Sequence, residues 1–244
     1  MSGRRVAVVG ATGGLGSAFV DALLAEASVD CVHACARSPG NSDSARLRWH
    51  PLDLLDPASI ASAASAIAEH GPLDLVLIAT GVLWGAHGNE QLQPEKSFNQ
   101  LTAANMETVF RLNTIGPALV LQQFMPLLRR DDRAVAAALS ARVGSISDNR
   151  LGGWHSYRAS KAALNMLIKG AAIEQRRINP LSIVVGLHPG TVATDLSAPF
   201  RKNVAAEKLF TPAMAAQQML QVLGRLTADD SGRCFAWDGK EVLP

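Results

Sequence analysis

Tyr157 and Lys161 are the residues of this chain whose types and spacing most directly suggest chemistry. Side chains four positions apart share one face of a helix, so the lysine ammonium can lie beside the phenol. A phenol has an ordinary pKa of about 10, and a neighbouring cation favours its ionised form. The pair is therefore a candidate acid and base near neutral pH, although the same spacing also occurs on ordinary solvated helix faces.

A glycine-rich turn near the start of the chain strengthens the catalytic interpretation of this pair. The turn at 10–16 follows the apolar run 6–9 and opens an amphipathic stretch at 17–25. Strand, glycine turn and helix in this order predict a dinucleotide site, because the backbone can approach a pyrophosphate at the helix N-terminus. An ordinary glycine-rich loop is the alternative. The expected contacts within the turn are Gly10, Thr12, Gly14, Leu15 and Gly16.

The end of the second expected strand indicates which dinucleotide is bound. An aspartate there would bond the ribose 2′-hydroxyl of NAD, whereas an arginine accommodates the 2′-phosphate of NADP. The residue in this chain is Arg37, whose guanidinium could also stack on the adenine ring. The sequence therefore favours NADPH, the alternative being a solvated arginine at a strand end.

Apolar runs and amphipathic stretches alternate along the chain without a linker. Two of the runs, 73–79 and 181–187, are nearly continuous, as expected of parallel strands buried on both faces. The alternation predicts one α/β domain over 1–244, a doubly wound parallel sheet of Rossmann type with its ligand at the carboxyl ends of the strands. Strands are expected at 5–9, 30–36, 46–49, 74–79, 134–140, 181–187 and 234–236. Helices are expected at 17–25, 57–69, 103–112 continuing to 128, 156–176 and 212–226.

Composition narrows the classes of function. The 244 residues are 48% hydrophobic, which is enough for a sizeable core, and the net charge is +2 without a basic run, which argues against nucleic acid. The three cysteines have neither metal-ligand spacing nor a disulfide framework, so no metal site is expected and a cytoplasmic location is favoured. The first 27 residues imitate a signal peptide, but glycines interrupt their apolar stretch. No apolar run reaches the roughly 18 residues of a membrane span.

Together these motifs resemble the short-chain dehydrogenase/reductase family over nearly the whole chain. The family's glycine motif is matched with Val9 in place of the usual threonine, and its active-site Tyr-x-x-x-Lys falls on Tyr157 and Lys161. The segments 143–147 and 232–244 look most like the C-factor-like branch. The family's Pro-Gly segment after the sixth strand gives the further expected cofactor contacts Pro189, Gly190, Val192 and Thr194.

The resemblance implies reduction of a small-molecule carbonyl by NADPH, or oxidation of the corresponding alcohol. It gives Tyr157 the role of the acid, while Lys161 lowers the phenol pKa and bonds the ribose hydroxyls. The family's helix asparagine matches Asn113, which is then expected to place a water beside the lysine. Asp53 and Leu54 match the family's adenine-contacting positions, with a turn-forming aspartate as the alternative.

The resemblance also implies which segments cover the substrate and which form subunit contacts. The loops at 81–100 and 194–209 are expected over the substrate, and the helices at 103–128 and 156–176 at the interface of a homodimer or homotetramer. A steroid, a pterin, an aromatic ketone and a small aldehyde all remain open as substrates. Phe200 in the second loop offers an apolar wall, and Trp84, Trp154 and His155 could add stacking surfaces or equally serve packing.

The chain departs from the family pattern at two places. Thr80 and Gly81 stand where the family has the end of Asn-Asn-Ala-Gly, so a small turn beside the ribose is kept and both amides are lost. The position of the family's catalytic serine is Ala141. Ser140 precedes it and points the other way on an extended strand, and Ser145 lies beyond a glycine. Ser140 is slightly favoured as the catalytic hydroxyl, with Ser145 as the other candidate.

Two other functions remain open beside carbonyl reduction. One is a nucleotide-binding protein with a regulatory or signalling role and little turnover, which Ala141 supports. The other is a related catalyst that uses the same fold for dehydration or epimerisation.

Overall fold

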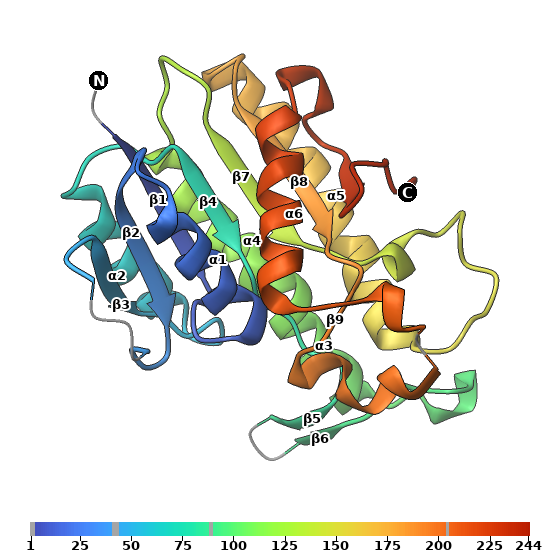
Figure 1. Cartoon of the computed structure of the whole chain (residues 1–244). Coiled ribbons are helices and arrows are strands. Elements are labelled where there is room, and N and C mark those ends of the chain that lie inside the picture. Colours follow the sequence, from blue (N-terminus) through green and yellow to red (C-terminus); the bar gives the residue numbers. More distant parts are fainter. Residues whose placement is uncertain (1–2, 41–43, 88–89, 204) are drawn as a thin grey trace.

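Seven parallel strands form the central sheet of the protein (Figure 1). The computed structural model describes residues 3–40, 44–87, 90–203 and 205–244. The strands are β1 (Arg4–Val9), β2 (Val29–Ala36), β3 (Leu47–Pro51), β4 (Leu75–Ile78), β7 (Val135–Leu139), β8 (Ile183–His188) and β11 (Cys234–Ala236). Their order is β11-β8-β7-β4-β1-β2-β3, so the direction of winding reverses between β1 and β4. A crevice for a ligand is expected at the carboxyl ends of the strands beside that reversal.

Helices cover both faces of the sheet and enclose two hydrophobic cores (Figure 1). The helices are α1 (Gly14–Ala25), α2 (Pro57–Ala68), α3 (Ala103–Phe110), α4 (Gly116–Phe124), α5 (His155–Ile178) and α6 (Pro212–Arg225). Helices α1 and α6 pack on one face, and α2, α4 and α5 on the other. Because both faces are covered, all four residues of β4 are buried, which explains the continuous apolar run in the sequence.

The predicted doubly wound α/β fold is confirmed, and every strand of the main sheet begins and ends within two residues of its predicted bounds. The short additional strands were not predicted. Strands β5 (Gly85–His87) and β6 (Glu90–Leu92) form an antiparallel hairpin, and β9 (Thr191–Val192) pairs with β10 (Leu209–Phe210). These pairs lie in or beside the two segments expected to cover the substrate. Strands of two or three residues are too short to show the alternation that identifies a strand.

The helix expected from 103 to 128 is continuous but changes its winding in the middle. Between α3 and α4 the chain makes one π-helical turn, Arg111–Ile115, and the last residues, Met125–Leu127, form a 3₁₀ turn. A side chain at Gly116 would meet the Leu54 side chain at 2.9 Å, so this residue allows the helix to approach the loop after β3. A π-helical turn inside an α-helix frequently marks a functional position, and this one carries Asn113.

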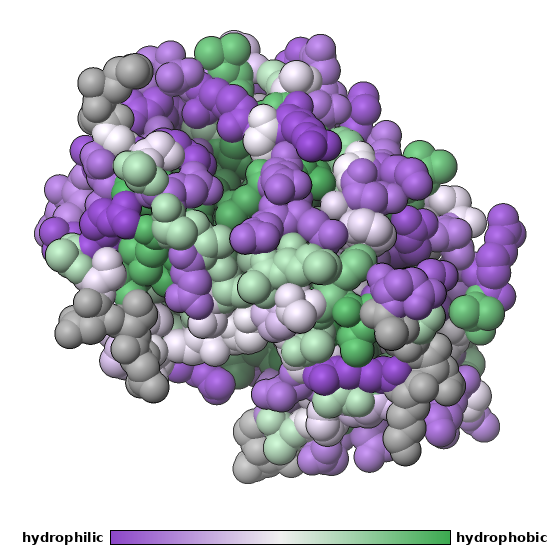
Figure 2. All heavy atoms as spheres, in the orientation of Figure 1, coloured by the Kyte–Doolittle hydropathy of each residue, from purple (hydrophilic) through white to green (hydrophobic). Residues whose placement is uncertain are grey.

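The surface that faces the viewer in Figure 1 is neither uniformly hydrophilic nor uniformly hydrophobic. Figure 2 shows that hydrophilic and hydrophobic residues alternate over this face in small patches. Among the described residues, no helix is long and apolar enough to cross a membrane, and no cluster of His, Cys, Asp and Glu side chains is arranged to hold a metal ion.

Three histidines cluster between the sheet and the C-terminal end of α2. His33 on β2 is fully buried, and its Nδ1 lies 2.9 Å from Nε2 of His50 on β3. The ring of His70 meets the His33 ring edge-on, with centroids 5.2 Å apart. Burial, and then the neighbouring His50 and His70, lower the pKa of His33 from 6.5 to about 3. The folded protein therefore keeps His33 neutral at pH values where the unfolded chain protonates it.

We expect the free energy of unfolding to fall as the pH drops below about 6.5, since the unfolded chain then binds a proton that folded His33 does not. The loss due to His33 is about 2 kcal/mol at about pH 5, and urea unfolding at about pH 7.5 and pH 5 measures it. His33→Gln should remove this part of the pH dependence, and His155→Gln, at a partly exposed position, should retain it. Equal pH dependence in His33→Gln and the parent protein would assign the effect to another group.

Candidate active site

Tyr157 and Lys161 lie on the first two turns of α5, with both side chains directed into the protein. Tyr157 is 9% exposed and Lys161 is 2% exposed. The lysine Nζ donates a hydrogen bond to the carbonyl oxygen of Leu139, at the end of β7, at 2.8 Å. The same Nζ lies 5.9 Å from the centroid of the tyrosine ring. The structure therefore brings the two residues together at the carboxyl end of the sheet.

Burial controls the protonation of both groups in this closed arrangement. It raises the pKa of the Tyr157 phenol to about 12, and it lowers the pKa of the Lys161 ammonium to about 8. The sequence predicted that the lysine would lower the phenol pKa, and that lowering is not what the closed site shows. At neutral pH the phenol carries its proton and the lysine is mostly charged. Tyr157 is accordingly ready to donate a proton rather than to accept one.

The Asn113 side chain is hydrogen-bonded to the segment that follows β4. Its side-chain Oδ1 accepts a hydrogen bond from the backbone N–H of Val82 at 2.8 Å, and its Nδ2 donates to the Val82 carbonyl at 2.9 Å. The Nδ2 also donates to the hydroxyl of Ser160 on α5 at 3.2 Å. The asparagine is fully buried, so its amide is satisfied by these partners. Asn113 thus joins the π-helical turn, the loop after β4 and α5 beside Lys161.

The two candidate catalytic serines make hydrogen bonds to residues other than Tyr157 and Lys161. The Ser140 hydroxyl donates to Oδ1 of Asn165 at 2.6 Å, and the Ser145 hydroxyl accepts from the backbone N–H of Asp148 at 3.1 Å. Ala141, by contrast, packs in the same hydrophobic cluster as Tyr157. Within the described residues, neither serine hydroxyl is hydrogen-bonded to the phenol. A catalytic role for either serine stays a prediction that this arrangement does not support.

Apolar and aromatic side chains surround Tyr157. Trp154 lies with its ring centroid 6.4 Å from that of Tyr157 and 4.9 Å from that of Phe200. The indole N–H of Trp84 donates to the carbonyl oxygens of residues 195 and 196, which connects the two segments expected over the substrate. The other members of this aromatic cluster are Leu83, Ala141, Val143 and Leu196.

A cavity of about 630 Å³ extends from the glycine turn to the loop after β4. Arg37 and Asp53 lie at its rim, and the carboxylate of Asp53 also accepts the backbone N–H of Leu55 at 2.9 Å, so this aspartate does form a turn. The residues predicted to bind the cofactor that line the cavity are Gly10, Thr12, Arg37, Asp53, Leu54, Thr80 and Gly81.

The residues of this cavity fit a dinucleotide. An added Cβ at Gly16 would lie 2.0 Å from the Gly10 carbonyl oxygen, so the tight turn that the phosphate would approach needs a glycine there, and Gly81 lies beside the Lys161 Nζ. The N-terminus of α1 has no side-chain cap, which leaves its first N–H groups for a phosphate. Among the residues that the structure describes, the buried hydroxyl of Thr80 has no hydrogen-bond partner, as expected of a group that meets a ligand.

The remaining predicted cofactor residues lie on the other side of the glycine turn. An added Cβ at Gly14 would meet the Thr194 side chain at 2.8 Å, so the segment after β8 adjoins the first turn of α1, where Leu15 is buried. Gly190 has a φ of 74°, and a side chain there would meet Phe210 at 2.7 Å. Val192 on β9 is buried in the core, and Pro189 lies between the strands β8 and β9.

Comparison with known proteins agrees with this geometry. The family model for short chain dehydrogenases matches residues 4–205, which is most of the chain. The chain belongs to the short-chain dehydrogenase/reductase family. Members of this family are NAD(P)-dependent oxidoreductases, and so is this chain; the cavity beside the glycine turn is its candidate nicotinamide dinucleotide site.

Three relatives of this short-chain dehydrogenase/reductase are informative. The 1-hydroxy-2-glutathionyl-2-methyl-3-butene dehydrogenase of Rhodococcus sp. (strain AD45) is 30% identical over 96% of this chain and 96% of its own length. The C-signal of Myxococcus xanthus is 32% identical over 70% of this chain and 93% of its own, in agreement with the C-factor-like branch. The crystal structure of NADPH-bound carbonyl reductase from chicken fatty liver superposes with a TM-score of 0.83, at 30% identity and with both chains fully covered.

The structure adds individual residues to the candidate site that the sequence did not single out, two of them in the segment 81–100. His87 and Arg111 line the cavity beside the glycine turn, and burial, then the charge of Arg37, lowers the pKa of His87. Glu95 is buried beside the first turn of α5. Neither His87 nor Glu95 belongs to a motif, and only the tertiary structure brings them to the site.

Proposed function

We propose that this short-chain dehydrogenase/reductase reduces a carbonyl compound with NADPH, with Tyr157 as the proton donor. The observation that carries the proposal is that Tyr157 and Lys161 lie together at the carboxyl end of β7, and that Lys161 adjoins Gly81, which lines the candidate dinucleotide cavity. The likeness to an NADPH-bound carbonyl reductase at 30% identity supports it. NADPH oxidation with a panel of ketones, aldehydes and quinones tests it.

The chain's own residues supply binding and the proton. A reduced nicotinamide, when bound, supplies the hydride. The Tyr157 phenol, protonated at neutral pH because burial raises its pKa to about 12, donates its proton to the carbonyl oxygen. Lys161 and Gly81 lie where the nicotinamide ribose is expected, and Asn113 holds the loop that carries Gly81. The lysine ammonium stabilises negative charge that develops on the phenol oxygen.

The walls around Tyr157 favour an apolar carbonyl compound. Two indole rings and Phe200 contribute flat hydrophobic surface, and Ala141 presents a methyl group where the family has a serine hydroxyl. A ketone or aldehyde with an aromatic or other flat substituent would stack on these rings, and a strongly charged group beside the carbonyl would be desolvated there without a partner.

Arg37 supports the choice of NADPH over NADH. Its side chain is exposed at the rim of the cavity, at the end of β2, where the 2′-phosphate of NADP is expected. We expect Arg37→Asp to weaken the preference for NADPH over NADH by about 10- to 100-fold, because a charge-assisted hydrogen bond is replaced by repulsion. The ratio of kcat/KM for the two nucleotides measures this. Arg130→Asp, an exposed charge reversal, is the control, and an unchanged ratio in Arg37→Asp would overturn the NADP assignment.

A second candidate function is nucleotide binding with a signalling role and little turnover. Ala141 favours it, because the site lacks the usual second donor to a substrate oxygen. The similarity to the C-signal of Myxococcus xanthus also supports it. A protein that binds NADPH and oxidises it with none of the carbonyl compounds would fit this candidate.

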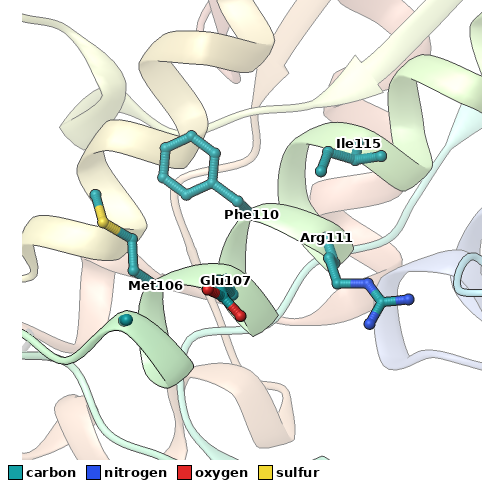
Figure 3. A pocket seen from close by; sticks show the side chains of 6 residues that line it. Met106, Glu107, Phe110, Arg111 and Ile115 are labelled. Atoms are coloured by element: carbon teal, nitrogen blue, oxygen red, sulfur yellow. The ribbon is translucent and has the colours of Figure 1, made fainter.

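We also propose that the protein forms a homodimer or homotetramer through α3 and α5. Figure 3 shows Met106, Phe110 and Ile115 beside a surface pocket of α3 and the π-helical turn. Ile115 is 49% exposed, and Met166 on α5 is 72% exposed. Apolar side chains of this size on two helices are typical of a surface that a second copy covers. Light scattering on the purified protein gives its mass in solution and tests the proposal.

A further inference from the structure

Glu95 is a buried carboxylate at the N-terminus of α5. The residue is 3% exposed, and its Oε2 accepts the backbone N–H of Ser156 at 3.2 Å. Its Oε1 accepts hydrogen bonds from the Ser156 hydroxyl and from Nδ2 of Asn105 on α3, the latter at 2.7 Å. Burial raises the pKa of Glu95, but the hydrogen bonds from Ser156, the backbone and Asn105 outweigh it, so the net shift is downward. The carboxylate is therefore charged at neutral pH.

The start of α5 needs such a partner because its own sequence supplies no cap. The residue before the helix is Trp154, whose side chain caps nothing and whose backbone is left-handed, with φ 51° and ψ 41°. Gly152 and Gly153 precede it with φ of 63° and 65°, so three consecutive residues are left-handed. A left-handed conformation costs a non-glycine residue about 1 kcal/mol or more. The backbone N–H of Trp154 donates to the carbonyl oxygen of Glu95, which helps to hold this turn.

The helix turn that Glu95 caps is the turn that carries the tyrosine. Ser156, which makes two hydrogen bonds to the carboxylate, directly precedes Tyr157. Trp154, bound by the Glu95 backbone, packs edge-on against the Tyr157 ring. Lys161 lies one turn farther along α5 and has its own anchor on the Leu139 carbonyl. A loosened first turn would therefore displace Tyr157 more than Lys161.

The part of the chain that precedes Glu95 is held by hydrogen bonds at two further points. Asn113 holds the backbone of Val82, and the Trp84 indole donates to the carbonyl oxygens of Asp195 and Leu196. Residues 82–87 and 90–95 thus contact the π-helical turn, the segment after β8 and the N-terminus of α5. We propose that Glu95 is a positioning residue that sets the orientation of Tyr157 by holding the first turn of α5. The proposal rests on the proposed function, which makes Tyr157 the proton donor.

Tyr157 is the single tyrosine of the chain, so the ultraviolet difference spectrum of its phenolate can be followed without another tyrosine in the background. In the parent protein we expect the phenol to titrate near its buried pKa of about 12. In Glu95→Gln the amide N–H₂ meets at least one donor of Ser156 or Asn105, so the first turn loosens and water reaches the phenol. The phenol pKa should then move down toward its ordinary value of about 10. Glu69→Gln, at the exposed C-cap of α2, is the matched control and should titrate like the parent protein.

Turnover gives the second readout. We expect Glu95→Gln to lower kcat for carbonyl reduction by about 10- to 100-fold, since a small displacement of a catalytic group has that effect, while the Kd for NADPH is nearly unchanged. In Glu95→Ala, added acetate should restore part of kcat by occupying the vacated carboxylate site, a rescue that a general loss of stability would not show. If Glu95→Gln does not fold, Ser156→Ala removes one of the hydrogen bonds and should shift the phenol titration in the same direction by less.

A phenol titration and kcat both unchanged in Glu95→Gln would overturn the positioning role, as would a loss of kcat without any change in the phenol titration. The titration needs no substrate, so it tests Glu95 separately from the proposed reductase activity. A protein that reduces no carbonyl compound but shows the shifted phenol titration would contradict the proposed function and keep the assignment of Glu95 to Tyr157.

Discussion

Tyr157→Phe is expected to lower kcat for carbonyl reduction by about a thousandfold or more, because the phenylalanine has no proton to donate and general acid catalysis contributes about 10²- to 10⁴-fold. The ring remains, so the packing of Trp154 and Ala141 against it is kept. Nucleotide binding should therefore be nearly unchanged. The measurement is NADPH oxidation with the carbonyl panel, together with NADPH binding followed by fluorescence, for the parent protein and the variant in parallel.

The possible outcomes separate the two candidate functions. Turnover that disappears in Tyr157→Phe while NADPH still binds would support the reductase. Turnover that survives in the variant would show that another group supplies the proton and would contradict the assigned role of Tyr157. If neither protein oxidises NADPH with any carbonyl compound but both bind it, a signalling role that needs only the bound nucleotide becomes the better account. In that case Tyr157→Phe should keep the biological effect.

The pKa values of the closed site add a constraint on pH. Burial raises the pKa of Tyr157 to about 12, so the phenol keeps its proton through the neutral range and can act as an acid there. Burial lowers the pKa of Lys161 to about 8, so the ammonium loses its charge as the pH rises through that value. The charge that stabilises a developing phenolate is thus present below about pH 8 and lost above it. A phenol that stays protonated and a lysine that stays charged at neutral pH both favour reduction of the carbonyl over oxidation of the alcohol.

The main sheet could be predicted from the sequence because its strands are buried on both faces. A continuous apolar run such as that of β4 indicates a buried strand when glycine turns and amphipathic stretches flank it. The positions of the glycine turn and of Arg37 in the fold could be predicted from the same pattern, since each lies directly after a strand. Sequence spacing also predicted that Ser140 and Ala141 point in opposite directions; in the structure they contact different residues of α5, since the Ser140 hydroxyl donates to Asn165 and Ala141 packs with Tyr157.

The parts that could not be predicted depend on contacts far apart in the chain. Glu95 meets Ser156 across 61 positions, and Asn113 holds Val82 across 31. The one local signal for the first contact is that Trp154 cannot cap α5, which implies a cap from elsewhere without saying where. The pKa of Tyr157 was predicted in the wrong direction for the closed site, because a spacing of four residues reveals a neighbouring cation but not the loss of water around the phenol.

Ala141→Ser is expected to raise kcat/KM for carbonyl reduction by about 10- to 100-fold. Ala141 packs in the same cluster as Tyr157, and its backbone is extended, with φ −151° and ψ 147°, which serine adopts without strain. The added hydroxyl would face the side on which the phenol meets the substrate oxygen, and one such donor is worth about 10²- to 10³-fold in kcat where it has been removed from other enzymes. We expect somewhat less, because the surrounding side chains are not arranged to orient the new hydroxyl.

Ala141→Ser should also lower the free energy of unfolding. This second measurement helps to interpret the change in kcat/KM. Ala141 is 7% exposed, so a hydroxyl there loses water when no substrate is bound, which costs about 1–3 kcal/mol if it finds no partner. A gain in kcat/KM together with a lower unfolding midpoint would place the new donor in the substrate site. If Ser140 instead turned its hydroxyl from Asn165 toward the substrate, Ser140→Ala would abolish turnover and Ala141→Ser would add little. Comparison of the two variants therefore decides whether this enzyme uses a serine at all or polarises its substrate with Tyr157 alone.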